Sequence, residues 1–207
     1  MGEYRCVATS LSGFVQQLAV SYLAHGYWFY VTGRIPDGKE PSAVDRKLID
    51  RYGIDISKWA RARRKQAGLA NLQYLRHDRF FVLLATHGKH DFFQAEAKAI
   101  RDARRVPIKY KGYSVSFRGG HAHVRIAQQQ YVELKAHLLT VATRHRGGAV
   151  AEELRSVPFA RYAPVRRQLL NILRALNRVR MSAGFEPVTH QALRLEREIV
   201  RPFAEQV

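Results

Sequence analysis

The pair Gly119-Gly120 constrains the fold more than any other feature of the sequence. Two glycines between extended segments are typical of a two-residue β-hairpin loop, because both loop positions need positive φ angles. With this loop, the two strand faces separate into an apolar set and a polar set. The apolar set is Tyr113, Val115, Phe117, Ala122, Val124 and Ile126, and the polar set is Ser114, Ser116, Arg118, His121, His123 and Arg125. A shift of one residue would destroy this separation, so we expect the apolar face to meet a core and the polar face to meet water or a ligand.

Hydrophobic periodicity predicts the remaining elements. Helices are expected over 10–25, 42–51, 57–66, 92–104, 128–144, 150–155, 164–182 and 189–198. Strands are expected over 27–32, 72–76, 79–85, 106–118 and 121–126. The predicted fold class is α+β, with a mixed or mostly antiparallel sheet of about five strands, flanking helices and a helical C-terminal part. We expect an α+β domain over 1–145 and a helical region over 146–207, either separate or packed on the same domain.

Net charge indicates the class of partner. The 207 residues include 35 Lys and Arg against 17 Asp and Glu, which gives a formal charge of +18. A folded chain with this charge repels itself unless a polyanion neutralises it, and nucleic acid is the usual polyanion. The preference for arginine fits this interpretation, because a guanidinium binds phosphate through two hydrogen bonds and stacks on bases. A genome rich in G and C would also favour arginine codons.

Several other classes are disfavoured by what the sequence lacks. It has no apolar run of about 18 residues, so we expect no membrane span and no membrane partner. Its first residues do not show a basic segment followed by an apolar one, so we expect no signal peptide. Cys6 is the only cysteine, which excludes an internal disulfide and a thiolate zinc site. A reducing, cytoplasmic location is the expected one.

The helix expected over 164–182 carries a polar face made of arginine and asparagine. Its members are Arg167, Asn171, Arg174 and Arg178, with Arg166 and Arg180 flanking them. Solvated helix faces usually include glutamate for intrahelical pairs, whereas 161–182 contains no acidic residue. We therefore expect this face to contact nucleic acid, with Asn171 able to reach a base edge. A plain solvated face is the alternative.

A second basic segment follows Trp59. It consists of Arg61, Arg63, Arg64 and Lys65. An aromatic side chain among cations suits single-stranded nucleic acid, because bases stack on rings. The alternative places Trp59 in the core and leaves the cations in water.

Two histidines of the hairpin could bind a metal. His121 and His123 are two residues apart on one strand face, so their side chains are about 6 to 7 Å apart. This spacing can hold a divalent ion such as Mg²⁺ or Mn²⁺ if another element supplies a third ligand. The candidates for that ligand are His87, His90, Asp91 and Glu96. Ordinary polar histidines at the end of a strand are the alternative.

The segment from His121 to Lys135 resembles the motif of rolling-circle replication initiators and relaxases. His121-Ala122-His123 is similar to their His-hydrophobe-His motif, and Tyr131 with Lys135 is similar to their tyrosine-lysine pair. The resemblance implies that the histidines hold a metal that polarises a DNA phosphate, which Tyr131 then attacks. Ala122 is smaller than the usual residue, and Tyr131 follows the histidines sooner than in the family. Tyr131 also fits an apolar helix stripe.

These patterns support two functional hypotheses, and they leave open whether the protein is an enzyme. The first is a basic protein that contacts the phosphate backbone of RNA or DNA as a subunit of a larger complex with other proteins. In one form of it, the protein is a structural component that recognises the shape of A-form RNA. The second is a metal-assisted endonuclease or strand transferase that uses His121 and His123, with Tyr131 as nucleophile.

Overall fold

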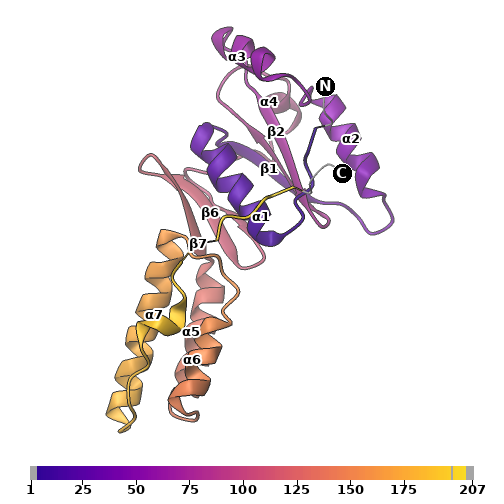
Figure 1. Cartoon of the computed structure of the whole chain (residues 1–207). Helices are drawn as coiled ribbons and strands as arrows, with labels where there is room; N and C mark the ends of the chain where they lie inside the picture. The colour runs from indigo at the N-terminus through magenta and orange to yellow at the C-terminus, as the bar shows by residue number, and fades with distance from the viewer. Residues whose placement is uncertain (1–3, 197, 204–207) are drawn as a thin grey trace. The chain divides into compact units, whose positions relative to one another are not determined.

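The computed structural model describes residues 4–196 and 198–203 and has the predicted α+β class, with helices that dominate after residue 126 (Figure 1). The chain forms two compact units. Of the described residues, the first unit contains 4–108, 115–123 and 200–203, and the second contains 109–114, 124–196 and 198–199. The boundary expected near residue 145 lies inside the second unit. No helix in the described part of the chain has the length and apolar character to cross a membrane.

A four-stranded sheet is the centre of the first unit. Its strand order is β2-β3-β1-β4. These strands are β1 (Phe29–Arg34), β2 (Leu72–His77), β3 (Phe80–Ala85) and β4 (Arg101–Asp102). All three pairs of neighbouring strands are antiparallel. Gly33 lies opposite Phe81, and a Cβ atom at Gly33 would come within 2.3 Å of that ring, so a larger residue here would require the ring to move.

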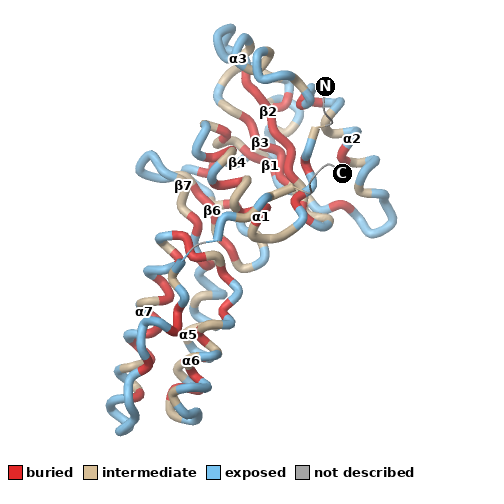
Figure 2. The backbone as a smooth tube through the Cα atoms, viewed as in Figure 1, coloured by how far each residue is buried: buried red, intermediate tan, exposed pale blue. Residues whose placement is uncertain are grey.

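Both faces of this sheet are covered, which explains why β3 is continuously apolar and why β2 is largely buried. On one face, Tyr74 and Leu83 join a core that includes Tyr52 and Phe92. On the other face, the Phe14 ring lies 6.0 Å from the rings of both His77 and Phe80. Figure 2 shows the central strands as largely buried.

The helices of the first unit agree with the sequence patterns except in two places. Their bounds are α1 (Leu11–Gln16), α2 (Pro41–Arg51), α3 (Lys58–Gln66) and α4 (Phe92–Ala95). The helix predicted over 10–25 is helical throughout, but it continues from α1 as a π-helix, η1 (Gln17–Tyr22), and a 3₁₀ turn, η2 (Leu23–His25). The helix predicted over 92–104 is wrong beyond Ala95, because Arg101 and Asp102 pair with β1 instead.

A three-stranded sheet contains the predicted hairpin. It consists of β5 (Ile108–Tyr110), β6 (Tyr113–Arg118) and β7 (His121–Ile126), in that order. Gly119 and Gly120 have φ angles of 55° and 80°, which confirms the two-residue loop. The strand predicted over 106–118 is divided by a turn at Lys111-Gly112, where φ is 40° and 80°. The expected sheet of about five strands is therefore two sheets, of four and three strands.

The second unit is mostly helical. Its helices are α5 (Gln128–Val141), α6 (Gly147–Arg155), α7 (Ala163–Ser182) and the short 3₁₀ helix η3 (His190–Leu193). Helix α5 packs against α6 and α7, and η3 packs against α6 and α7. The core between them is aliphatic, with Val150, Leu154, Leu169, Ile172 and Leu176 fully buried. Of the final helix predicted over 189–198, only the η3 turn forms among the described residues.

Candidate nucleic-acid interface

Helix α7 has the two faces that its sequence predicts. Its apolar side is in the core, where Val165, Leu169, Ile172 and Leu176 are all completely buried. Its opposite side is exposed and consists of Arg166, Arg167, Asn171, Arg174 and Arg178. The helix therefore presents a row of guanidinium groups to solvent.

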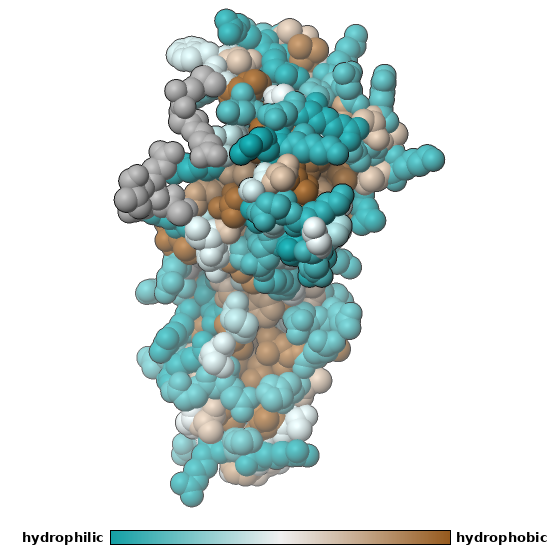
Figure 3. Space-filling view, turned by 90° about the vertical axis from the view of Figure 1, so that its right-hand side faces the viewer, coloured by the Kyte–Doolittle hydropathy of each residue, from teal (hydrophilic) through white to brown (hydrophobic). Residues whose placement is uncertain are grey.

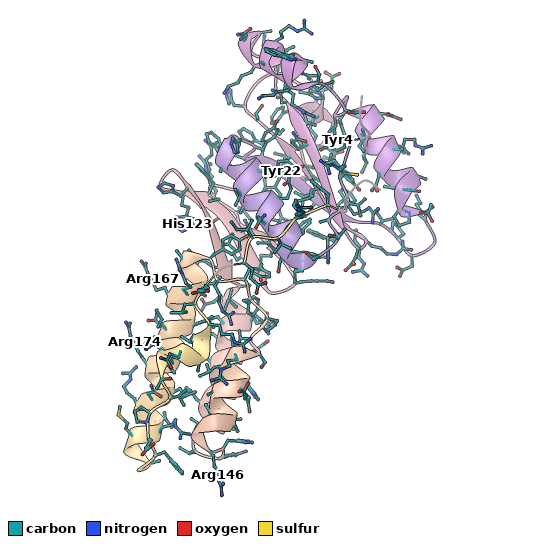
Figure 4. The ribbon with its side chains drawn as sticks, viewed as in Figure 1. Tyr4, Tyr22, His123, Arg146, Arg167 and Arg174 are labelled. Atoms are coloured by element: carbon teal, nitrogen blue, oxygen red, sulfur yellow. The ribbon has the colours of Figure 1, made fainter. Side chains whose placement is uncertain are left out.

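The exposed residues of α7 border a groove of about 540 Å³. Arg166, Arg167, Asn171 and Arg174 line it, together with the apolar side chains of Ala163, Leu170 and Leu195. Arg167 and Arg174 lie on the same side of the helix (Figure 4). The Arg174 Nη1 atom donates a weak hydrogen bond of 3.4 Å to Asn171 Oδ1, so most donors of this guanidinium remain available. Leu195 was not expected at this site, because it comes from the segment predicted as a separate helix over 189–198.

No acidic side chain within the described ranges forms an ion pair with the arginines of this groove. Exposed ion pairs occur elsewhere, for example between Arg104 and Asp102. Figure 3 shows another face of the molecule, on which hydrophilic residues also predominate. Among the described residues, no ion pair therefore neutralises the positive charge of the groove, which is the electrostatic condition for binding an anion.

Side-chain hydrogen bonds fix the position of α7 within the second unit. The buried Gln168 side chain accepts a hydrogen bond from Ile126 N at 2.9 Å and donates one to Ile126 O at 3.1 Å. Near the other end of the helix, the Asn177 amide makes two bonds of 2.9 Å with the backbone of Val188. These contacts hold the exposed face in one orientation, which is what a binding surface requires.

Two arginines, one just before α7 and one near its C-terminal end, are buried and make hydrogen bonds within the protein. Arg180 was expected to flank the exposed face, but it is only 2% exposed and donates to the carbonyl groups of Ala142, His145 and Glu186. Arg161 is also buried and donates to carbonyl groups of Val157, Phe159 and Leu193. Burial lowers the pKa of Arg161. Both guanidiniums are occupied, so neither contributes to the candidate interface.

Helix α3 carries the second basic segment. Ser57 caps it by accepting a hydrogen bond from Ala60 N, and no residue of the helix is fully buried. Trp59 is 80% exposed, so the alternative that placed it in the core is wrong. Arg63 and Lys65 are also exposed, and Arg61 and Arg64 are half-buried. Because Trp59 and Arg63 are four residues apart, they share one side of the helix.

The polar face of the hairpin is only partly accessible. Arg118, His121 and Arg125 are exposed, while Ser114 and His123 are half-buried. Ser116 is only 8% exposed, so its hydroxyl does not belong to a surface that could meet a polymer. This face therefore offers fewer contacts than the sequence suggested.

Among the described residues, the histidines of the hairpin do not form part of a metal site. Within residues 4–196 and 198–203, no three side chains of His, Cys, Asp or Glu are grouped so that they could hold an ion. Two of the expected third ligands have other partners: His90 Nδ1 accepts from Phe92 N at 3.0 Å, and Glu96 Oε1 accepts from the Tyr52 hydroxyl at 2.5 Å. Tyr131 is half-buried in the first turn of α5, which belongs to the second unit.

Comparison with known proteins identifies no relative of this chain. No protein-family model matches the chain, and no curated protein is significantly similar to it.

Proposed function

We propose that this protein binds the phosphate backbone of nucleic acid through the exposed face of α7. The observation that supports the proposal is the groove lined by Arg166, Arg167, Asn171 and Arg174, whose cations have no acidic partner among the described residues. A guanidinium is suited to this contact because its donors match two phosphate oxygens at once. The amide of Asn171 can add a neutral hydrogen bond to a phosphate, a sugar or a base edge.

The length of the face fits a polymer better than a single small anion. Arg167 and Arg178 are separated by 11 residues of helix, or about 16 Å at 1.5 Å per residue. Successive phosphates advance by about 3.4 Å along the axis of a duplex, so the row can meet several of them. Release of the counterions from these phosphates would supply the affinity.

Helix α3 supplies a second type of contact in this proposal. The exposed ring of Trp59 can stack on an unpaired base, while Arg63 on the same side can bind the neighbouring phosphate. Stacking is available only where bases are not paired. This part of the proposal therefore concerns single-stranded nucleic acid or the single-stranded parts of a folded RNA.

The test compares two variants that lose the same charge. Arg167→Ala/Arg174→Ala removes two cations from the groove, and Arg46→Ala/Lys47→Ala removes two exposed cations from α2. Fluorescence anisotropy measures the affinity for labelled single-stranded RNA, single-stranded DNA and duplex DNA between about 50 and 200 mM salt. We expect the groove variant to lose about tenfold or more in affinity and its salt slope to fall by about 2.

The control variant should keep an affinity within about threefold of the wild type, because cations that do not line the groove act only through screened, nonspecific attraction. An equal loss in both variants would show that net charge alone drives binding, and the groove would have no special role. Absence of binding to all three nucleic acids at low salt would refute the proposed function.

A further inference from the structure

A second cavity lies wholly within the first unit and takes no part in the α7 groove. Its volume is about 370 Å³, which is within the usual range of small-molecule pockets. Five segments that are far apart in the sequence line it: the N-terminal segment, η1, the start of α3, β2 and the segment that contains Phe203. Tyr4 and Tyr22, which come from the first two of these segments, are shown in Figure 4.

The π-helix is responsible for one wall of this pocket. In an α-helix, residues five apart are turned by about 140° from each other, so Gln17 and Tyr22 would lie on different sides. A π-helix joins residue i to residue i+5, which brings these two positions together. Gln17 and Tyr22 accordingly both line the pocket, and the Gln17 side chain lies close enough to the Tyr22 hydroxyl to influence its pKa. Single π-helical turns are common at functional sites.

The polar groups behind this wall form a connected network. Tyr4 and Tyr22 lie close enough to influence each other's pKa, and the Tyr4 hydroxyl donates to Gln73 Oε1 at 2.6 Å. Gln73 Nε2 in turn donates to the Tyr27 hydroxyl at 3.3 Å. Burial raises the pKa of both Tyr4 and Tyr22, so both phenols stay protonated and can act as hydrogen-bond donors. A network of this kind fixes donors and acceptors in place before a ligand arrives.

The charged groups of the pocket are two arginines and one carboxylate. The Arg5 guanidinium lies over the Phe203 ring, with its Cζ atom 5.9 Å from the ring centre. Arg61 donates from Nη2 to Ile54 O, while its buried Nε has no hydrogen-bond partner among the described residues. Asp55 is exposed at the same site. The pocket therefore combines a net positive charge with aromatic rings and side-chain amide groups.

We propose that this pocket binds one nucleoside monophosphate, either as a free nucleotide or as the phosphorylated end of a strand. The base would lie against the aromatic rings with its polar edge towards Gln17, and the phosphate would bind Arg5 and Arg61. Asp55 can accept hydrogen bonds from ribose hydroxyls, as carboxylates do in dinucleotide-binding proteins. The choice of ligand rests on the proposed function, but the pocket and the α7 groove do not share any residue.

Isothermal titration calorimetry with the four ribonucleoside monophosphates tests the proposal. Uridine and adenosine without phosphate, and inorganic phosphate without a base, serve as partial ligands. We expect at least one nucleotide to bind with a Kd below about 1 mM, and each partial ligand to bind about tenfold more weakly or not at all. Equal affinity for inorganic phosphate and for all four nucleotides would overturn the proposal, because no base would then be recognised.

Two variants locate the binding in this pocket. Arg5→Ala and Gln17→Ala should each weaken nucleotide binding by about tenfold, whereas Arg34→Ala, which removes an exposed cation from the same unit, should not. Circular dichroism melting shows whether each variant is folded. Unchanged binding in folded Arg5→Ala and Gln17→Ala proteins would overturn the proposal.

The same experiments distinguish the two sources of the ligand and test the two proposals independently. Competition of a 5′- or 3′-phosphorylated oligonucleotide with the bound nucleotide would identify a strand end as the ligand, and its absence would identify the free nucleotide. If Arg167→Ala/Arg174→Ala loses polymer binding but keeps nucleotide binding, both proposals are supported. If polymers bind and no nucleotide does, only the pocket proposal is refuted.

Discussion

The side-chain amide of Gln168 makes both of its backbone contacts with a single residue, Ile126. Ile126 N donates to its oxygen at 2.9 Å, and its nitrogen donates to Ile126 O at 3.1 Å. Gln168 is 5% exposed and Ile126 is 2% exposed, so neither backbone group of Ile126 can turn to water instead. This pair joins the last residue of β7 to the first turns of α7.

Replacement of Gln168 by leucine should destabilise the second unit. Gln168→Leu leaves a buried N–H and a buried C=O without partners, each at a cost of about 1 to 3 kcal/mol. Urea unfolding measures the loss, and Asn171→Leu, at an exposed position of the same helix, is the control. A loss in Gln168→Leu no larger than in the control would show that the Ile126 contacts do not stabilise the unit.

Two neighbouring arginines of α7 should respond in opposite ways. Arg178 is exposed, so Arg178→Ala should weaken nucleic-acid binding and leave the melting temperature nearly unchanged. Arg180 is buried and binds three carbonyl groups, so Arg180→Ala should lower stability by about 3 kcal/mol or more. Calorimetric melting and anisotropy on the same samples separate the two effects. Similar behaviour of the two variants would contradict this division of roles.

Trp59 should distinguish single strands from duplexes. Because base stacking on an aromatic ring contributes about 1 to 3 kcal/mol, Trp59→Ala should weaken binding to single strands by about tenfold. Trp59→Phe keeps an aromatic ring and should restore much of this affinity. Binding to duplex DNA should change little, since its bases are not free to stack. An equal loss for single strands and duplex would show that Trp59 does not stack on bases.

His90 should make stability depend on pH. Burial and the charge of Arg64 lower its pKa below the usual 6.5, and its Nδ1 atom accepts a hydrogen bond from Phe92 N only when unprotonated. The folded state therefore binds this proton less readily than the unfolded chain. The stabilising effect is fully present above about pH 6.5 and is lost as the pH falls through the lowered pKa.

His90→Asn retains an acceptor for Phe92 N and cannot titrate. The difference in unfolding free energy between pH 7.5 and pH 5.5 should therefore be smaller in this variant than in the wild type. Identical pH dependence in the two proteins would show that His90 does not control it.

The hairpin shows what the sequence could predict. Its pairing depends on a two-glycine loop and on the alternation of neighbouring residues, both of which are local signals. The apolar stripe and the exposed face of α7 were predicted for the same reason, because they follow from helix periodicity alone. Which of these surfaces binds nucleic acid stays a prediction.

The errors arose where residues distant in sequence decide the outcome. Trp59 was weighed as a core residue because large aromatic residues are usually buried, yet it is 80% exposed. Arg180 was expected to flank the exposed face, but it lies four residues after Leu176 on the buried side of α7, where carbonyl groups 35 and 38 residues away bind it. The first-unit pocket could not be found at all, because five separate segments build it and its helical wall is not an α-helix.

The π-helical turn between Gln17 and Tyr22 also limits how this chain can change in length. In a π-helix each backbone hydrogen bond joins residues five apart, whereas in an α-helix it joins residues four apart, so the π-helical turn contains one extra residue. Loss of one residue there, for instance the exposed Val20, would let α1 continue as an ordinary helix and would relieve a rare backbone conformation. The same deletion would leave Gln17 and Tyr22 four residues apart, a spacing at which an α-helix still places both residues on one side. In this segment, a chain one residue shorter would therefore keep the two residues together, whereas an ordinary α-helix of the present length would separate them.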